Sequence, residues 1–177
     1  ECDLFLKDKG FKFDLITAIS MFYDISEPLK FIEKTSDLLN DNGSILIEVN
    51  YAKSFFERKN VDMLGQEHLI YYFIDTFSKL INKTSLNVND AYLTDMNGGN
   101  ITFLISKKTH QSERYLKLID EEKIWLKTFD FKNFEKIVNQ GFDKFKEKVI
   151  SISNTSEIKI LGASTRGALI IQMLGLD

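Results

Sequence analysis

The residue types best suited to proton transfer stand side by side at Glu67 and His68, within the aromatic stretch QEHLIYYF over residues 66–73. An imidazole titrates close to neutral pH, so His68 can accept a proton from a substrate without special tuning. The other histidine, His110, falls in a linker, where we expect it to be solvated. A packed or surface histidine is the plainer interpretation of His68, and the residues alone leave it open.

A second candidate site is the glycine-flanked segment GASTRG over residues 162–167. It follows a predicted strand over 157–161 and opens a predicted apolar helix over 169–174. Backbone N–H groups, two hydroxyl groups and a guanidinium at a helix N-terminus suit a phosphate. The alternative is an ordinary tight turn between a strand and a helix. The candidate contacts are Gly162, Ser164, Thr165 and Arg166.

An α/β sheet must position these residues, and the first half of the chain predicts one. The apolar, β-branched runs over 13–19 and 44–49 are typical of buried strands in a parallel sheet. Apolar residues at helical spacing follow Pro28 between them, and Asn42–Gly43 is predicted to end that helix. We therefore expect a right-handed crossover between two adjacent parallel strands.

The remaining segments extend this sheet and then turn helical. Residues 50–72 are predicted to be irregular, followed by a helix over 74–82. The strands over 86–95 and 100–106 are expected to form an antiparallel pair in the same sheet, because a Gly-Gly turn separates them. The charged, periodic stretch over 111–153 predicts two helices, the second of them capped by Asp130.

Two loops of this predicted sheet are candidate ligand contacts. Ile19, Ser20 and Met21 fall at the carboxyl end of the first strand, where open α/β sheets bind ligands. The alternative for them is a place in the core. The turn between the last two strands, Asn97–Gly98–Gly99–Asn100, is either a binding loop or a plain hairpin turn.

Composition excludes several classes of protein. The chain has 177 residues, and its 44% hydrophobic content is that of a globular protein rather than a disordered one. A net charge of −3 predicts no nucleic-acid or membrane partner. The single cysteine, Cys2, leaves no cysteine-rich metal site. Since no apolar run reaches the roughly 18 residues of a membrane span and no signal-type N-terminus is visible, we expect a cytoplasmic protein.

The order of these motifs resembles the sugar C-methyltransferase family, a group of class I S-adenosylmethionine-dependent methyltransferases. Members methylate a keto-sugar attached to a nucleoside diphosphate. The resemblance covers nearly the whole chain in the family's order, and its most specific parts are the Glu-His-Leu-x-Tyr-Tyr segment and the Gly-Ala-Ser-Thr-Arg-Gly loop. The segments that carry it are FDLITAISMFYDISEPLKFIEKTSDLLNDNGSILIEV (13–49), NVDMLGQEHLIYYF (60–73), DMNGGNITFLISK (95–107) and LGASTRGA (161–168).

The resemblance implies three parts. These are the C-terminal half of a Rossmann-like methyltransferase domain over 1–108, a helical connection over 109–155, and the start of a second, nucleotide-sugar-binding α/β domain over 156–177. Members carry an N-terminal zinc-binding segment and then a Gly-rich loop that holds the methionine end of the cofactor. Neither is visible before Phe13, so we expect a chain truncated at both ends, without zinc and with weak or no cofactor binding alone.

The family mechanism implies a role for each candidate residue. His68 would remove the proton beside the keto group, and Glu67 would orient a group or bind a sugar hydroxyl. Asp3, at the turn after a third strand, would bind the adenine amino group, although a frayed terminal aspartate is the alternative. Cofactor contacts would come from Ile19, Ser20 and Met21. Substrate contacts would come from Asn97, Gly98, Gly99 and Asn100, and nucleotide-sugar contacts from Gly162, Ser164, Thr165 and Arg166.

The chain departs from the family at three positions. Many members have Tyr or Cys and then His before the Glu-His pair, where this chain has Gly65 and Gln66. Some place a histidine after the first strand, where this chain has Met21. These differences leave open an O- or N-methyltransferase of polysaccharide or antibiotic sugars, and also a non-catalytic domain fragment. The sequence specifies neither the sugar and nucleotide nor the oligomeric state.

Overall fold

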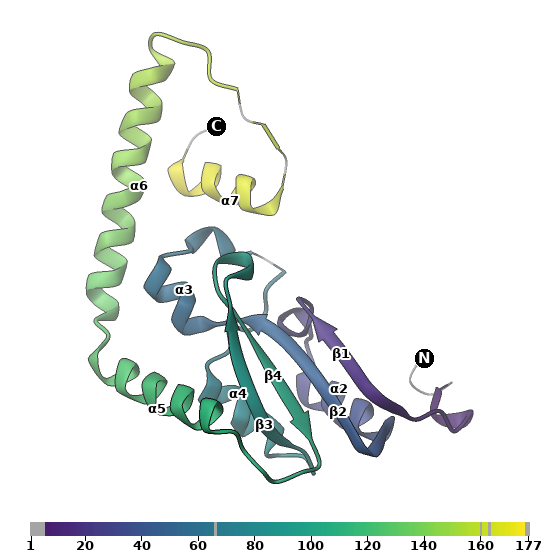
Figure 1. Ribbon diagram of the computed structural model, residues 1–177. Coiled ribbons are helices and arrows are strands. Elements are labelled where there is room, and N and C mark those ends of the chain that lie inside the picture. The colour runs from purple at the N-terminus through teal and green to yellow at the C-terminus, as the bar shows by residue number, and fades with distance from the viewer. Residues whose placement is uncertain (1–5, 66, 160, 163, 176–177) are drawn as a thin grey trace.

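The computed structural model describes residues 6–65, 67–159, 161–162 and 164–175 of the chain. Its centre is a four-stranded mixed sheet in the order β1-β2-β4-β3 (Figure 1). β1 pairs with β2 in parallel, whereas β2 with β4 and β3 with β4 are antiparallel. The predicted α/β fold, with parallel strands beside an antiparallel hairpin, is therefore confirmed. The strands are β1 (Phe13–Ile19), β2 (Leu39–Asn50), β3 (Asn87–Thr94) and β4 (Asn100–Ser106).

The crossover helix α2 (Pro28–Asp37) begins at its proline and connects β1 to β2. The prediction that it continues to Asn42–Gly43 is wrong, because β2 already begins at Leu39. Gly43 lies inside β2, where a Cβ would stand 2.8 Å from the carbonyl oxygen of Phe13. The glycine is therefore required by the close approach of two strands and not by the end of a helix.

One face of the sheet carries the core. α4 (Ile74–Ile81) packs there, and Phe77 stacks on Phe103 of β4 with ring centroids 3.9 Å apart. The prediction that β1 is buried throughout is wrong, because Ala18 is its one buried residue and Leu15 is 57% exposed. β1 is an edge strand in the described sheet, so it has a neighbouring strand on one side alone.

The segment predicted to be irregular, 50–72, contains helix α3 (Ala52–Arg58) and a turn of 3-10 helix, η2 (Val61–Met63). α3 is short and has no side-chain cap. Its stability comes from long-range aromatic contacts, such as Phe55 against Tyr71 with centroids 5.6 Å apart. Tertiary packing of this kind is invisible to local sequence patterns.

The stretch over 111–153 is helical, as predicted, with α5 (Glu113–Thr128) and α6 (Phe131–Ser153). Asp130 caps α6 by accepting a hydrogen bond from the backbone N–H of Asn133, which confirms that prediction. The predicted strand over 157–161 is wrong for its described residues, because no described strand lies beside them to pair with their backbone. α7 (Thr165–Leu174) follows and folds back onto η2 and α6 (Figure 1).

Candidate functional site

His68 is held by a backbone carbonyl that determines which of its ring nitrogens is free. Its Nδ1 lies 2.9 Å from the carbonyl oxygen of Met63. Because a carbonyl can only accept, Nδ1 must carry the hydrogen, and in the neutral ring Nε2 then holds the lone pair. The hydroxyl of Tyr71 donates to the same carbonyl over 2.8 Å. The arrangement leaves Nε2 of a half-buried imidazole available as a base.

The His68 loop is attached to the segment that follows β1. The backbone N–H groups of Leu69 and Ile70 both donate to the carbonyl oxygen of Tyr23, over 3.0 and 3.2 Å. The ring of Tyr23 also packs edge-on against His68, with centroids 4.5 Å apart. Tyr23 belongs to a 3-10 turn, η1 (Phe22–Asp24), directly after β1. His68 is therefore positioned at the carboxyl end of the parallel strands.

Two carboxylates stand near His68. Partial loss of hydration raises the pKa of Asp24, with His68 opposing that shift and Glu67 adding to it. Asp24 thus interacts electrostatically with both His68 and Glu67, although Glu67 itself is exposed. A positive charge that develops on the imidazole would be stabilised by both carboxylates. Sequence reasoning named Glu67 but missed Asp24, which is 44 residues away from His68 in the chain.

The candidate cofactor contacts gather at the end of β1. Ile19 is 49% exposed and Met21 is 38% exposed, so their apolar side chains can contact a ligand. Ser20 adopts a left-handed backbone conformation with φ of 51°, and its hydroxyl donates to Glu48 Oε1 over 3.2 Å. The assignment of Ile19, Ser20 and Met21 to cofactor binding stays a prediction. Asp3 lies outside the described residues.

Sequence reasoning missed a buried polar network beside Ser20. Glu48 of β2 also accepts hydrogen bonds from Asn100 Nδ2 over 3.0 Å and from the hydroxyl of Thr102 over 3.5 Å. Asn100, a predicted substrate contact, is 0% exposed and takes part in this network. The signal in the sequence was a charged residue at the end of an otherwise apolar strand, SILIEV over 44–49.

The loop before β4 is built from left-handed residues. Asn97, Gly98 and Gly99 have φ values of 50°, 81° and 117°. A Cβ on Gly99 would stand 2.6 Å from the Cβ of Ser54 in α3. The side-chain amide of Asn60 donates to the carbonyl oxygen of Gly98 over 2.7 Å. The predicted contact residues Asn97, Gly98 and Gly99 are thus docked on α3 and on the start of η2, and Asn97 is exposed.

Replacing Gly99 by alanine should lower the stability of the chain by about 1–3 kcal/mol, because the new methyl group meets both a positive φ and the Ser54 side chain. Gly141→Ala is the matched control. Gly141 lies within α6 with open space around it, so alanine there should raise stability by about 0.5–1 kcal/mol. Urea unfolding followed by circular dichroism measures both changes. Equal effects of the two substitutions would contradict this account of the loop.

The second half of the GASTRG segment, residues 165–167, forms the first turn of α7. Ser164 caps the helix, its hydroxyl accepting from the backbone N–H of Gly167 over 3.4 Å. Thr165 and Arg166 are already helical, so the helix begins four residues before the predicted 169. The Arg166 guanidinium lies 3.9 Å from Asp62 of η2, the residue before Met63. Arg166 therefore lies on the side of the molecule that holds His68, and Gly162, with φ of 110°, precedes the cap.

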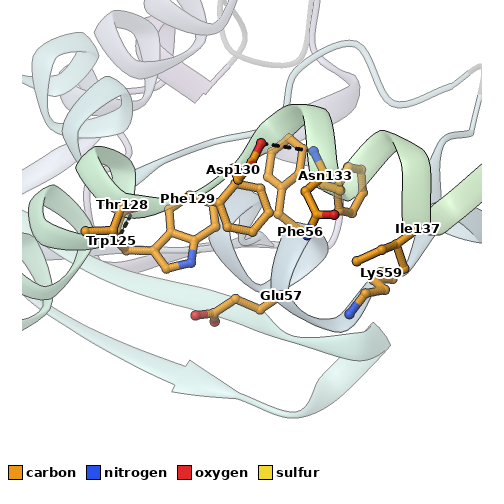
Figure 2. A pocket seen from close by; sticks show the side chains of 10 residues that line it. Phe56, Glu57, Lys59, Trp125, Thr128, Phe129, Asp130, Asn133 and Ile137 are labelled. Atoms are coloured by element: carbon orange, nitrogen blue, oxygen red, sulfur yellow. Dashed lines mark hydrogen bonds between the residues drawn. The ribbon is translucent and has the colours of Figure 1, made fainter.

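A separate pocket of about 330 Å³ opens between α3, α5 and α6, and Figure 2 shows its lining. Phe56 is surrounded there by aromatic rings, including Phe129 and Phe134 at centroid distances of 5.6 and 5.1 Å. Glu57 and Lys59 are the charged residues of its wall apart from the cap Asp130. None of the predicted site residues lines this pocket. It lies where α3 meets the corner between α5 and α6, apart from the candidate site.

Among the residues that the structure describes, no helix is long and apolar enough to cross a membrane. The described residues likewise contain no group of three His, Cys, Asp or Glu that could hold a metal ion.

No known protein-family model matches the chain, and no curated protein matches it. Similar solved structures include "crystal structure of M1.HpyAVI" (TM-score 0.41, 16% identity, 62% of this chain and 51% of that chain). "The structure of LepI complex with SAM" has a TM-score of 0.45 and 13% identity over 55% of this chain and 27% of that one. "crystal structure of M1.HpyAVI-SAM complex" has a TM-score of 0.41 and 15% identity over 63% of this chain and 52% of that one.

This chain therefore spans about half, or in one case about a quarter, of the length of these structures. Two of the three were solved as complexes with SAM, as their descriptions state. Because every TM-score lies below 0.5, the function has to be argued from this chain's own residues.

Proposed function

We propose that the chain is part of an S-adenosylmethionine-dependent methyltransferase that acts on a nucleotide-activated keto-sugar and methylates the carbon beside the ketone. The observation that carries the proposal is the orientation of His68. Its Nδ1–H is committed to the Met63 carbonyl, so its Nε2 is left as a base at the carboxyl end of the sheet. The resemblance of residues 60–73 to the sugar C-methyltransferase segment supports the choice of substrate.

The chemistry requires a base that acts on a C–H bond. His68 Nε2 takes the proton from the carbon beside the ketone, and the electron pair of that bond moves toward the carbonyl oxygen of the sugar. The imidazole gains a positive charge beside Asp24 and Glu67, which stabilise it. S-adenosylmethionine, when bound, would supply an electrophilic methyl group for this carbon, and its sulfur would keep the electron pair of the broken S–CH₃ bond. Ile19, Ser20 and Met21 would hold that cofactor at the end of β1.

The proposal is tested by the proton transfer alone, which needs no cofactor. A nucleoside-diphosphate keto-sugar is incubated with the chain in D₂O, and proton NMR follows deuterium entering the position beside the ketone. We expect exchange well above the rate of the buffer alone. Absence of exchange, together with methylation of a hydroxyl or an amine once S-adenosylmethionine is added, would refute the proposal in favour of O- or N-methyl transfer.

Replacing Arg166 by alanine should weaken the affinity for the nucleoside diphosphate by roughly tenfold, since a charge-assisted hydrogen bond to a phosphate would be lost. The exchange rate at a saturating sugar concentration should barely change. Calorimetric titration of the nucleotide sugar measures the affinity. Lys117→Ala is the control, because that exposed cation lies on α5 and pairs with Glu121. If the Arg166 variant binds the nucleotide sugar with unchanged affinity, this segment is not the binding site of the diphosphate.

A further inference from the structure

Asn50 lies at the end of a series of buried side-chain hydrogen bonds that begins at Glu48. Asn100 donates from Nδ2 to Glu48 Oε1 over 3.0 Å, and Asn50 donates from Nδ2 to Asn100 Oδ1 over 3.3 Å. Asn50 is 6% exposed and Glu48 is 8% exposed. The three residues come from the adjacent strands β2 and β4, so rigid backbone holds the chain of bonds in place.

The carboxylate of Glu48 determines which group donates and which accepts along this series of hydrogen bonds. Glu48 accepts every side-chain hydrogen bond that the structure gives it, so Asn100 must present its NH₂ group to Glu48. Asn100 then presents Oδ1 to Asn50, and Asn50 must donate to it from its own NH₂ group. Asn50 is left with Oδ1 at its free end. That oxygen is buried, and no described residue donates to it.

A small cavity lies against Asn50, with a volume of about 10 Å³, which is room for about one water-sized group. Met63, Tyr71 and the loop residues Asn97–Gly99 form part of its wall. Tyr71 donates to the Met63 carbonyl, the same group that holds Nδ1 of His68. The cavity and the candidate base therefore share one supporting carbonyl.

We propose that Asn50 is a specificity-determining residue whose Oδ1 accepts a hydrogen bond from one hydroxyl group of the substrate. Glu48 and Asn100 are positioning residues that keep this acceptor turned toward the cavity. The inference rests on the proposed function, because the hydroxyl group in question belongs to the sugar on which His68 is proposed to act. A buried acceptor without a donor weakens binding, so an analogue that lacks the hydroxyl is rejected. An ordered water is the other donor that the cavity can hold.

Calorimetric titration with a nucleoside-diphosphate hexose and its monodeoxyfluoro analogues distinguishes the two donors, because fluorine has a similar size and cannot donate. We expect one analogue to bind about tenfold more weakly than the parent sugar, or worse, while the others bind within about twofold. The variant Asn50→Leu should lose this selectivity. Asn40→Leu, which changes a surface asparagine of the same strand that binds Asp14, should keep it.

Glu48→Gln tests the positioning role with little change of shape. A glutamine can donate as well as accept, so both asparagine amides become free to turn and the selectivity should shrink. Thermal melting establishes that each variant is folded. Full selectivity in a folded Glu48→Gln protein would overturn the positioning role.

Two outcomes with the wild-type chain are distinguishable. Equal binding of the parent sugar and every analogue would overturn the inference alone, since water would then satisfy Asn50. Failure of the parent sugar to bind would overturn the proposed function, and the inference with it.

Discussion

Replacing His68 by asparagine should lower the rate of deuterium exchange beside the ketone by about 10² to 10⁴, the usual contribution of a positioned general base. Asparagine keeps the approximate size of imidazole, and its amide can still donate to the Met63 carbonyl that Nδ1 now occupies. What it lacks is a basic nitrogen. The affinity for the nucleotide sugar should therefore stay close to that of the wild type, and NMR exchange together with calorimetry measures the two effects separately.

The chain contains its own control for this experiment. His110 is the other histidine and it is exposed; its backbone carbonyl, not its ring, accepts a hydrogen bond from Asn89 Nδ2. His110→Asn should leave the exchange rate unchanged. If His68→Asn also exchanges at the wild-type rate, the base is another group. An already nucleophilic hydroxyl or amine then becomes the better acceptor, and O- or N-methyl transfer the better function.

The sheet was predictable because its signals are local. Continuous apolar runs marked β1 and the central part of β2, and a Gly-Gly turn marked the β3–β4 hairpin. The boundaries of α2 and α3 were not predictable from such signals. Gly43 looks like a helix end in sequence but serves a close strand contact, and α3 depends on aromatic residues far along the chain. Local propensity says nothing about either contact.

The candidate site was predictable to a similar, limited degree. His68 and Glu67 could be named from residue type, but the hydrogen bond that fixes the His68 tautomer depends on a carbonyl, which every residue has. The Glu48–Asn100–Asn50 chain joins two strands that are 50 residues apart in sequence, and only the register of β2 against β4 brings it together. Asp24 escaped notice because its relevance comes from the loop that docks on Tyr23.

A long-range contact of the same kind caps α4, and it involves the buried carboxylate of Glu122. This residue of α5 accepts from the backbone N–H groups of Ile74 and Asp75 over 2.7 and 3.0 Å, at the N-terminus of α4. It is 1% exposed. Burial raises the pKa of Tyr51, and the neighbouring Glu122 adds to the shift. Glu122 therefore connects α5 to the N-terminus of α4 and lies beside Tyr51, the residue that follows β2.

Replacing Glu122 by alanine should destabilise the chain by about 3 kcal/mol or more, because one buried and one partly buried N–H group lose their acceptor at once. Glu122→Gln retains one carbonyl oxygen and should cost roughly half as much. Its neighbour Glu121 is the matched control. That carboxylate pairs with Lys117 over 3.8 Å on the exposed face of α5, so Glu121→Ala should change stability by no more than about 0.5 kcal/mol. Urea unfolding compares the three variants. Similar stabilities for Glu122→Ala and Glu121→Ala would mean that α4 keeps its N-terminus without help from α5.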